Sequence, residues 1–358
     1  MKNRLFTLLV VLLGAVFLLA ACGGEEAAPE PAEEAEPAAE EMTEEESGGT
    51  TVMDGDQFKL AAIFPGTITD ADYNTLGHVG ITAVNETFGV EIAFSETVAV
   101  PDVDRVMREY IDDGSNIIFT HGGQFLNQTI ELAKEFPEVS FIAEGDAQVA
   151  DLPDNVWVIV RNMERGAYGA GVVAAKLSET GKIGYLGGLT LPFSYAEVHA
   201  IDQALADNGL TDVELVSVWA GDFNDPSTAR ELADTMIADD VDVIISSLNL
   251  GTLGVFEAAS NAAGDVKVIA KYTDKSEFAP DVYVTSMLYD FAGPLEDIVG
   301  NIMAGARTGN YDLGFDTGIG LQLPLTNAPD ELTGETEALM ADLAAGNVEI
   351  VKNTDPIE

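Results

Sequence analysis

Short apolar segments alternate with amphipathic helical segments along most of this chain, and this alternation constrains the fold more than any other feature. Each short segment holds five or six mostly apolar residues, for example 59–64, 116–120 and 182–186. Such runs, separated by helical stripes, predict parallel sheets that are covered by helices on both faces. Because the pattern occurs twice, we predict an α/β fold of two Rossmann-like lobes with a cleft between them.

The domain boundaries follow from the same alternation. An N-terminal lobe is expected over residues 53–162, and an Ala- and Gly-rich helix from about Arg165 to Ser178 carries the chain into a second lobe, 163–287. A long helical segment from Ala292 returns toward the first lobe. We therefore assign about 288–324 to the N-terminal lobe and about 325–358 to the C-terminal lobe.

The loop around Phe223 is the most informative single stretch. It follows the predicted strand 213–218, and Asp225 and Pro226 are suited to the N-cap and first position of the next helix. Phe223 therefore lies at the carboxyl end of a strand, where open α/β sheets bind ligands. The ring either folds onto its own helix or offers a face on which a flat ligand stacks, and the rest of the chain favours stacking.

The N-terminus has the layout of an export signal. Lys2 and Arg4 precede an apolar run from Leu8 to Ala21, which is short for a membrane span. We expect residues 1–21 to be a signal peptide, and Cys22, which follows small residues and is the one cysteine of the sequence, to be lipidated. The alternative is an ordinary signal peptide that happens to leave a cysteine. The expected location is extracytoplasmic, with a lipid anchor as the only membrane contact.

Charge excludes one class of partner. Residues 22–52 are expected to form a disordered stalk, because this stretch contains eleven Glu and no Lys or Arg. The whole chain carries a formal net charge of −46, with 16 Lys plus Arg against 62 Asp plus Glu. Nucleic acid is therefore an unsuitable partner. A high-salt habitat is a reasonable hypothesis, because salt would screen the repulsion.

The sequence contains few of the residue patterns that mark an enzyme active site. The histidines at 78, 121 and 199 are far apart and lack zinc-ligand spacing, and neither a nucleophile elbow nor a P-loop lysine is present. We expect no catalytic residue, no metal and no cofactor. What remains is a set of rings and hydrogen-bonding groups near the predicted strand ends, which suits a flat heterocycle. The candidate binding residues are Tyr73, Asn74, His121, Gly122, Asp146, Phe193, Phe223, Asn224, Asn249, Tyr272, Asp274 and Tyr289.

Several segments resemble the basic membrane protein family of lipoproteins, the purine-nucleoside-type substrate-binding proteins of ABC importers. The resemblance covers nearly all of the chain from Lys59 to about Leu325. Its most specific segments are 164–168 (ERGAY), 181–188 (GKIGYLGG), 222–226 (DFNDP), 251–259 (GTLGVFEAA) and 279–287. It implies the type I periplasmic-binding fold.

The resemblance also implies site roles. A purine base would be sandwiched between Tyr73 and Phe223, with Asp146 hydrogen-bonded to the base edge. The chain departs from the family where the first strand usually ends in Asp, which is here Phe64 or Pro65. The Asp that usually holds the ribose aligns with Tyr272, and its partner Lys aligns with Tyr289 or Leu288. Tyr272 either packs in the core or marks a loss of sugar contacts, and the second interpretation favours a free nucleobase such as adenine over a nucleoside.

The sequence thus predicts a monomeric, lipid-anchored binding protein that delivers a purine-like ligand to an ABC permease and its ATPase. A surface sensor or adhesin with the same fold is the alternative. A nucleoside hydrolase is disfavoured, because no metal set or activated nucleophile is visible in the sequence.

Overall fold

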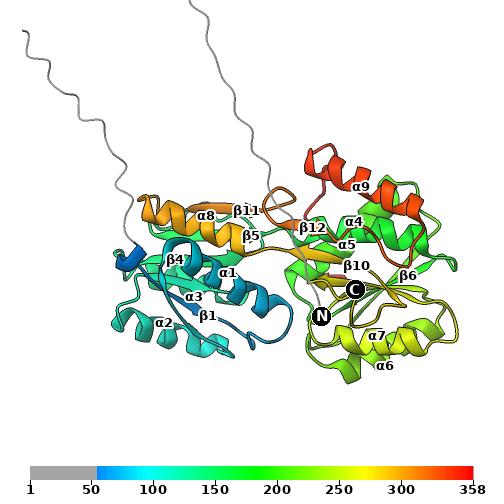
Figure 1. Ribbon diagram of the computed structural model, residues 1–358, viewed down its shortest axis with the longest axis horizontal. Helices are drawn as coiled ribbons and strands as arrows, with labels where there is room; N and C mark the ends of the chain where they lie inside the picture. The colour runs from blue at the N-terminus through cyan, green and yellow to red at the C-terminus, as the bar shows by residue number, and fades with distance from the viewer. Residues whose placement is uncertain (1–54, 358) are drawn as a thin grey trace, which may run out of the picture. The chain divides into compact units, whose positions relative to one another are not determined.

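The computed structural model describes residues 55–357, and these contain two six-stranded sheets (Figure 1). The predicted signal peptide, Cys22 and the acidic stalk all lie outside the described residues. In spatial order, the first sheet consists of β11 (Gly309–Leu313), β5 (Val156–Arg161), β4 (Ser140–Gly145), β3 (Ile117–Thr120), β1 (Lys59–Ile63) and β2 (Glu91–Ser95). All of its neighbouring strands are parallel, as predicted.

The second sheet repeats the plan with one exception. Its strands, in spatial order, are β12 (Ile319–Leu321), β10 (Tyr283–Tyr289), β9 (Lys267–Tyr272), β8 (Val243–Ser247), β6 (Lys182–Gly187) and β7 (Glu214–Trp219). β12 pairs antiparallel with β10, and the other pairs are parallel. The sequence assigned about 288–324 to the first lobe; β12 lies within that range and is hydrogen-bonded into the second sheet.

Helices lie against both sheets (Figure 1). The central strands are buried, whereas the edge strands β2 and β7 contain no buried residue. The first sheet is accompanied by α1 (Tyr73–Phe88), α2 (Val103–Asp112), α3 (Leu126–Ala133) and α8 (Ala292–Met303), with α8 packed along α1. The second is accompanied by α4 (Met163–Leu177), α5 (Pro192–Asp207), α6 (Pro226–Ala238), α7 (Thr252–Asn261) and α9 (Asp330–Ala344). Three short 3-10 helices complete the described structure: Gly55–Gln57, Val100–Asp102 and Gly123–Phe125. These layers confirm the predicted fold class.

The chain passes between the two sheets three times. It crosses from β5 into α4 at residue 162, from β10 into α8 at residues 290–291, and from β11 into β12 at residues 314–318. Multiple crossings of this kind allow two lobes to move as units about a hinge.

Local chemistry explains where the helices near the strand ends begin. The Asp225 carboxylate accepts hydrogen bonds from the backbone N–H groups of Ser227 and Thr228, and Pro226 takes the first helical position, as the sequence predicts. The sequence pattern predicts that the helix after β6 begins at Ala196, whereas α5 begins four residues earlier, at Pro192. The Ser194 hydroxyl accepts from the Leu191 backbone N–H at 2.9 Å and fixes this turn. Phe193 therefore lies on the first turn of a helix rather than on a loop.

Candidate ligand-binding site

A cavity of about 550 Å³ lies where the carboxyl ends of both sheets face each other. The first-lobe part of its lining includes Tyr73, Asp146 and Arg161, and the second-lobe part includes Phe193 and Phe223. Its size falls within the range of small-molecule sites, and the combination of several rings with a few polar groups is typical of them. The cavity is thus an inter-lobe cleft at the position that strand polarity predicts.

Tyr73 forms the aromatic wall of the first lobe. Its ring is stacked on that of His121, with centroids 4.0 Å apart and an interplanar angle of 26°. His121 is fully buried; its Nε2 donates to the Tyr73 carbonyl at 2.8 Å, and its Nδ1 lies 2.5 Å from Oε1 of buried Glu144. The Tyr73 hydroxyl donates to the same carboxylate. His121 and Glu144 therefore fix the orientation of the Tyr73 ring.

Phe193 and Phe223 form the aromatic wall of the second lobe. Their ring centroids are 6.1 Å apart at an interplanar angle of 21°. A Cβ built on Gly188 would lie 2.2 Å from Cδ1 of Phe223, so the ring rests directly on this glycine. Phe223 is half-buried and does not fold onto its own helix alone. The glycine after β6 thus determines how deeply the ring sits at the cleft.

Arg161 is the main site residue that sequence reasoning missed. Its Nη1 donates to the Tyr73 hydroxyl at 2.9 Å, and its Nη2 donates to Asp146 Oδ1 at 2.6 Å. The guanidinium carbon also lies 5.8 Å from the centroid of the Phe193 ring, across the cleft. Arg161 is buried and is the last residue of β5, whereas the apolar pattern of the sequence predicts a strand over 156–160 only. An arginine at a strand end in so acidic a chain was the signal that could have found it.

The remaining polar groups at the cavity differ in how many hydrogen bonds they can still form with a ligand. The Asp146 side chain keeps 21% exposure, and Arg161 engages its Oδ1. Asn74 is already committed, since its Oδ1 accepts from the Gly66 backbone N–H at 3.2 Å and its Nδ2 donates to Asp70 at 2.7 Å. Asp146 is therefore better placed than Asn74 to meet a hydrogen-bond donor on a ligand.

Tyr272 holds an unusual backbone conformation at the cavity wall. Its φ is +73°, a region that bulky residues rarely adopt and that often marks functional sites. Its ring centroid lies 5.8 Å from that of Tyr73 and 5.6 Å from that of Tyr289. Tyr272 is only 6% exposed and also borders the cavity. It therefore both packs in the core and lines the cavity.

A buried lysine lies beneath this wall. The Lys271 ammonium is 4.9 Å from the centroid of Phe193, 5.0 Å from that of Tyr272 and 5.6 Å from that of Tyr289. It is paired with the equally buried Glu197. Burial lowers the pKa of Lys271, and the Glu197 carboxylate opposes that shift. The three rings and their enclosed ammonium, hereafter the lysine cage, fill this side of the cleft with protein.

The structure brings most of the predicted binding residues to one place. Those that line the cavity are Tyr73, Asn74, Asp146, Phe193, Phe223, Asn224, Asn249 and Tyr272. The other four lie outside its lining: His121 supports Tyr73, Gly122 precedes the 3-10 helix at 123–125, Asp274 is exposed, and Tyr289 donates to the Met163 carbonyl at 3.1 Å. Within residues 55–357, no group of three His, Cys, Asp or Glu side chains is arranged to hold a metal ion.

Solved structures with the same architecture include solute-binding proteins of ABC transporters. The fold matches an ABC transporter solute-binding protein of Conexibacter woesei with a TM-score of 0.68 and 24% identity, over 83% of this chain and 100% of that one. A solute-binding protein of Aeropyrum pernix matches with a TM-score of 0.71 and 20% identity, over 83% of this chain and 94% of that one. The fold is thus that of the type I periplasmic solute-binding proteins. No helix among the described residues is long and apolar enough to cross a membrane.

Sequence comparison narrows the class. Residues 58–352 match the Bmp family model, described as ABC transporter substrate-binding protein PnrA-like, and the chain belongs to this family. It is 28% identical to basic membrane protein A2 of Borrelia garinii subsp. bavariensis over 264 residues, 71% of this chain and 77% of the relative. It is 27% identical to a purine-binding protein of Brucella abortus over 273 residues, 75% of each chain. The family binds substrates for ABC transporters outside the cytoplasm and is not an enzyme family.

Proposed function

We propose that this protein binds a purine-like heterocycle between its lobes and delivers it to an ABC permease. The observation that carries the proposal is that Tyr73 from the first lobe and Phe193 and Phe223 from the second line the same cavity. Stacking of one heterocyclic base on an aromatic side chain contributes ~1–3 kcal/mol. A ligand that contacts both walls favours the closed arrangement of the lobes, because only that arrangement offers both contacts.

Polar groups beside the two aromatic walls would form hydrogen bonds with the edge of the bound heterocycle. The Asp146 carboxylate, positioned by Arg161, accepts hydrogen bonds from ring or exocyclic N–H groups of a base. The relative from Brucella abortus is named for purine binding, which supports the same ligand class. A strongly anionic ligand is disfavoured, because the chain is acidic throughout and the one arginine at the cavity is already paired with Asp146 and Tyr73.

Within this class, a free nucleobase fits better than a nucleoside. By the family resemblance, Tyr272 and either Tyr289 or Leu288 align with the residues that hold the sugar, and the Lys271 ammonium lies 5.0 Å from the ring centroid of Tyr272 and 5.6 Å from that of Tyr289. The Tyr289 hydroxyl is engaged by a backbone carbonyl. A ribose would meet rings rather than a carboxylate and an ammonium, so its hydroxyl groups would lose water without gaining partners.

Delivery requires the protein to stay near its permease. We propose that Cys22 carries the lipid that anchors the chain, that the acidic stretch up to residue 52 spaces the folded part from the membrane, and that the binding protein acts as a monomer. Mass spectrometry of the mature N-terminus tests the anchor. A diacylglyceryl mass on Cys22 is expected, and an unmodified cysteine or an intact leader would contradict it.

A thermal-shift panel of nucleobases, nucleosides and sugars tests the ligand class. Nucleobases are expected to raise the melting temperature at least as much as their nucleosides, and Phe223→Ala should abolish the shift. Phe278→Ala is the matched control, because Phe278 is 59% exposed and does not line the cavity. A panel in which only sugars stabilise the protein would refute the purine assignment.

A further inference from the structure

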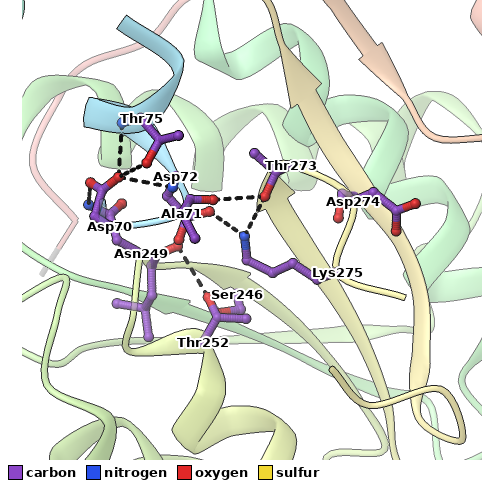
Figure 2. A network of polar contacts seen from close by, with 12 residues as sticks. Asp70, Ala71, Asp72, Thr75, Ser246, Asn249, Thr252, Thr273, Asp274 and Lys275 are labelled. Carbon is purple, nitrogen blue, oxygen red and sulfur yellow. Dashed lines mark hydrogen bonds and ion pairs between the residues drawn. The ribbon is translucent and has the colours of Figure 1, made fainter. Parts of the chain in front are cut away.

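Beside the cavity, a second set of contacts joins the lobes (Figure 2), and of its residues only Asn249 also lines the cavity. Lys275, just after β9, pairs with the Asp72 carboxylate of the first lobe, and the Thr273 hydroxyl donates to the Ala71 carbonyl at 3.0 Å. Nδ2 of Asn249 lies 3.5 Å from Oδ2 of Asp70. We call Asp70, Ala71, Asp72, Asn249, Thr273 and Lys275 the inter-lobe latch.

The first-lobe side of the latch is held rigidly. The Asp70 carboxylate accepts from the backbone N–H groups of Asp72 at 2.9 Å, Asn74 at 3.1 Å and Thr75 at 3.0 Å, so it closes the first turn of α1. Ala71 is held at φ +59°, a conformation that costs ~1 kcal/mol or more in a residue other than glycine. This backbone turns the Ala71 carbonyl and the Asp72 carboxylate toward Thr273 and Lys275 (Figure 2).

The charged pair of the latch is buried in this arrangement. Asp72 is 1% exposed and Lys275 is 3% exposed, although each comes from a loop and each belongs to a different lobe. The Lys275 ammonium also donates to the Thr273 hydroxyl at 3.0 Å. Separating the lobes would return both charges to water. The stability of the closed form therefore depends on the cost of burying the two charges relative to the energy gained by pairing them.

We propose that Asp72 and Lys275 make closure of the two lobes respond to pH, with the closed form taking up a proton at this pair. The geometry supplies the coupling, since one acid and one base from opposite lobes share a dry contact that exists only while the lobes are together. The site differs from the ligand cavity, and the proposal does not depend on which ligand the cavity takes.

The direction of the response follows from the carboxyl group. Burial raises the pKa of Asp72 from 3.8 to about 7, against the lowering effect of Lys275. The other charged or titratable groups that face Asp72 are Asp70 on its own loop and, on β9, Lys271 and Tyr272. With the lobes apart the carboxyl group meets water and regains its ordinary pKa. The closed form thus binds the proton more tightly, so closure is favoured as the pH falls below 7 and weakened as the pH rises through it.

Lobe separation in the ligand-free, full-length protein tests this inference. A ketone-bearing amino acid at each of the exposed positions Glu138 and Asn261 carries a spin label, so that Cys22 is not labelled. Double electron–electron resonance then measures the distance between the two labels, one on each lobe. The ratio of closed to open protein is expected to be about tenfold or more higher at pH 5 than at pH 8.5. Asp72→Asn should stay closed at both pH values, whereas Lys275→Met should open at pH 8.5 and close again at pH 5.

Two further variants keep the test decisive. Lys267→Met removes an exposed ion pair with Asp265 within the second lobe and should leave the wild-type profile unchanged. Thr273→Val removes one neutral hydrogen bond across the lobes and should lower the closed-to-open ratio about fivefold at both pH values. Identical distance distributions for the wild type, Asp72→Asn and Lys275→Met at both pH values would overturn the proposal. Opening of the wild type at pH 5 instead of pH 8.5 would overturn it equally.

Discussion

The ring of Tyr73 lies nearly flat against the ring of buried His121, with centroids 4.0 Å apart. His121 also holds the Tyr73 backbone carbonyl and contacts Glu144, the acceptor of the Tyr73 hydroxyl. The histidine thus acts on the cleft through the tyrosine. A ring at the cavity wall can serve as a stacking surface only if its orientation is fixed before the ligand arrives.

Replacement of His121 by Ala should therefore weaken ligand binding without removing a ligand contact. We expect the dissociation constant of the best purine ligand to rise about five- to tenfold, because the free ring loses its support. The free energy of unfolding should fall by ~2–3 kcal/mol, since Glu144 loses a buried partner. Calorimetric titration and denaturant unfolding measure the two effects. His78→Ala is the matched control, because His78 is half-buried on α1 and lies outside the cavity lining.

A methyl group at Gly188 should displace Phe223. The Cβ of an alanine there would lie 2.2 Å from the Phe223 ring, so the ring must move. We expect Gly188→Ala to raise the dissociation constant about tenfold and to lower the free energy of unfolding by ~1–3 kcal/mol. Gly264→Ala serves as control, because a Cβ at that position meets no atom within 4 Å. Unchanged binding by Gly188→Ala would show that the position of Phe223 does not matter to the ligand.

Tyr272 is expected to decide between base and nucleoside. Tyr272→Asp returns a carboxylate to the cavity wall near the Lys271 ammonium, and aspartate tolerates a positive φ better than tyrosine. Nucleoside affinity should rise about tenfold or more relative to that of the free base, because hydroxyl groups then find a charged acceptor. Tyr272→Phe keeps the ring and should leave the ratio unchanged. Parallel titrations with adenine and adenosine give this ratio, and an unaltered ratio in Tyr272→Asp would contradict the assignment.

The buried Asp72 carboxyl should also give the folding equilibrium a pH dependence. Its pKa of about 7 in the folded protein exceeds the ordinary value of 3.8, so its contribution to stability is complete below about pH 4 and is lost as the pH rises through 7. Asp70, Lys271, Tyr272 and Lys275 face it. The quantity to compare is the free energy of unfolding of the wild type minus that of Asp72→Asn. As the pH rises from 4 to 7, this difference should fall by at most ~1.4 kcal/mol per pH unit. Urea unfolding across this range measures it; a rising difference would contradict the pKa direction.

The sequence was sufficient to predict the layers of the fold because strand and helix periodicities are local. The sequence pattern predicts a helix from about Tyr73 to Phe88 and a cap formed by Asp225 and Pro226, and the structure has both. Strand ends in a parallel sheet share one edge, so most rings predicted there do meet at one cavity.

What sequence reasoning missed depends on contacts between distant segments. Arg161 looks like an ordinary strand-end residue until the fold places it against Tyr73 and Asp146. His121 follows a strand, as the other candidates do, but the ring of Tyr73 covers it. The pairing of Asp72 with Lys275, 203 positions apart, carries no local signal at all.

A crystal structure of the protein grown with the best-binding nucleobase tests the central claim most directly. We predict that the plane of the base lies between the rings of Tyr73 and Phe223, in van der Waals contact with both, and that a base edge is hydrogen-bonded to Asp146. A ligand bound elsewhere, or held by its edge with both rings turned away from it, would contradict the account.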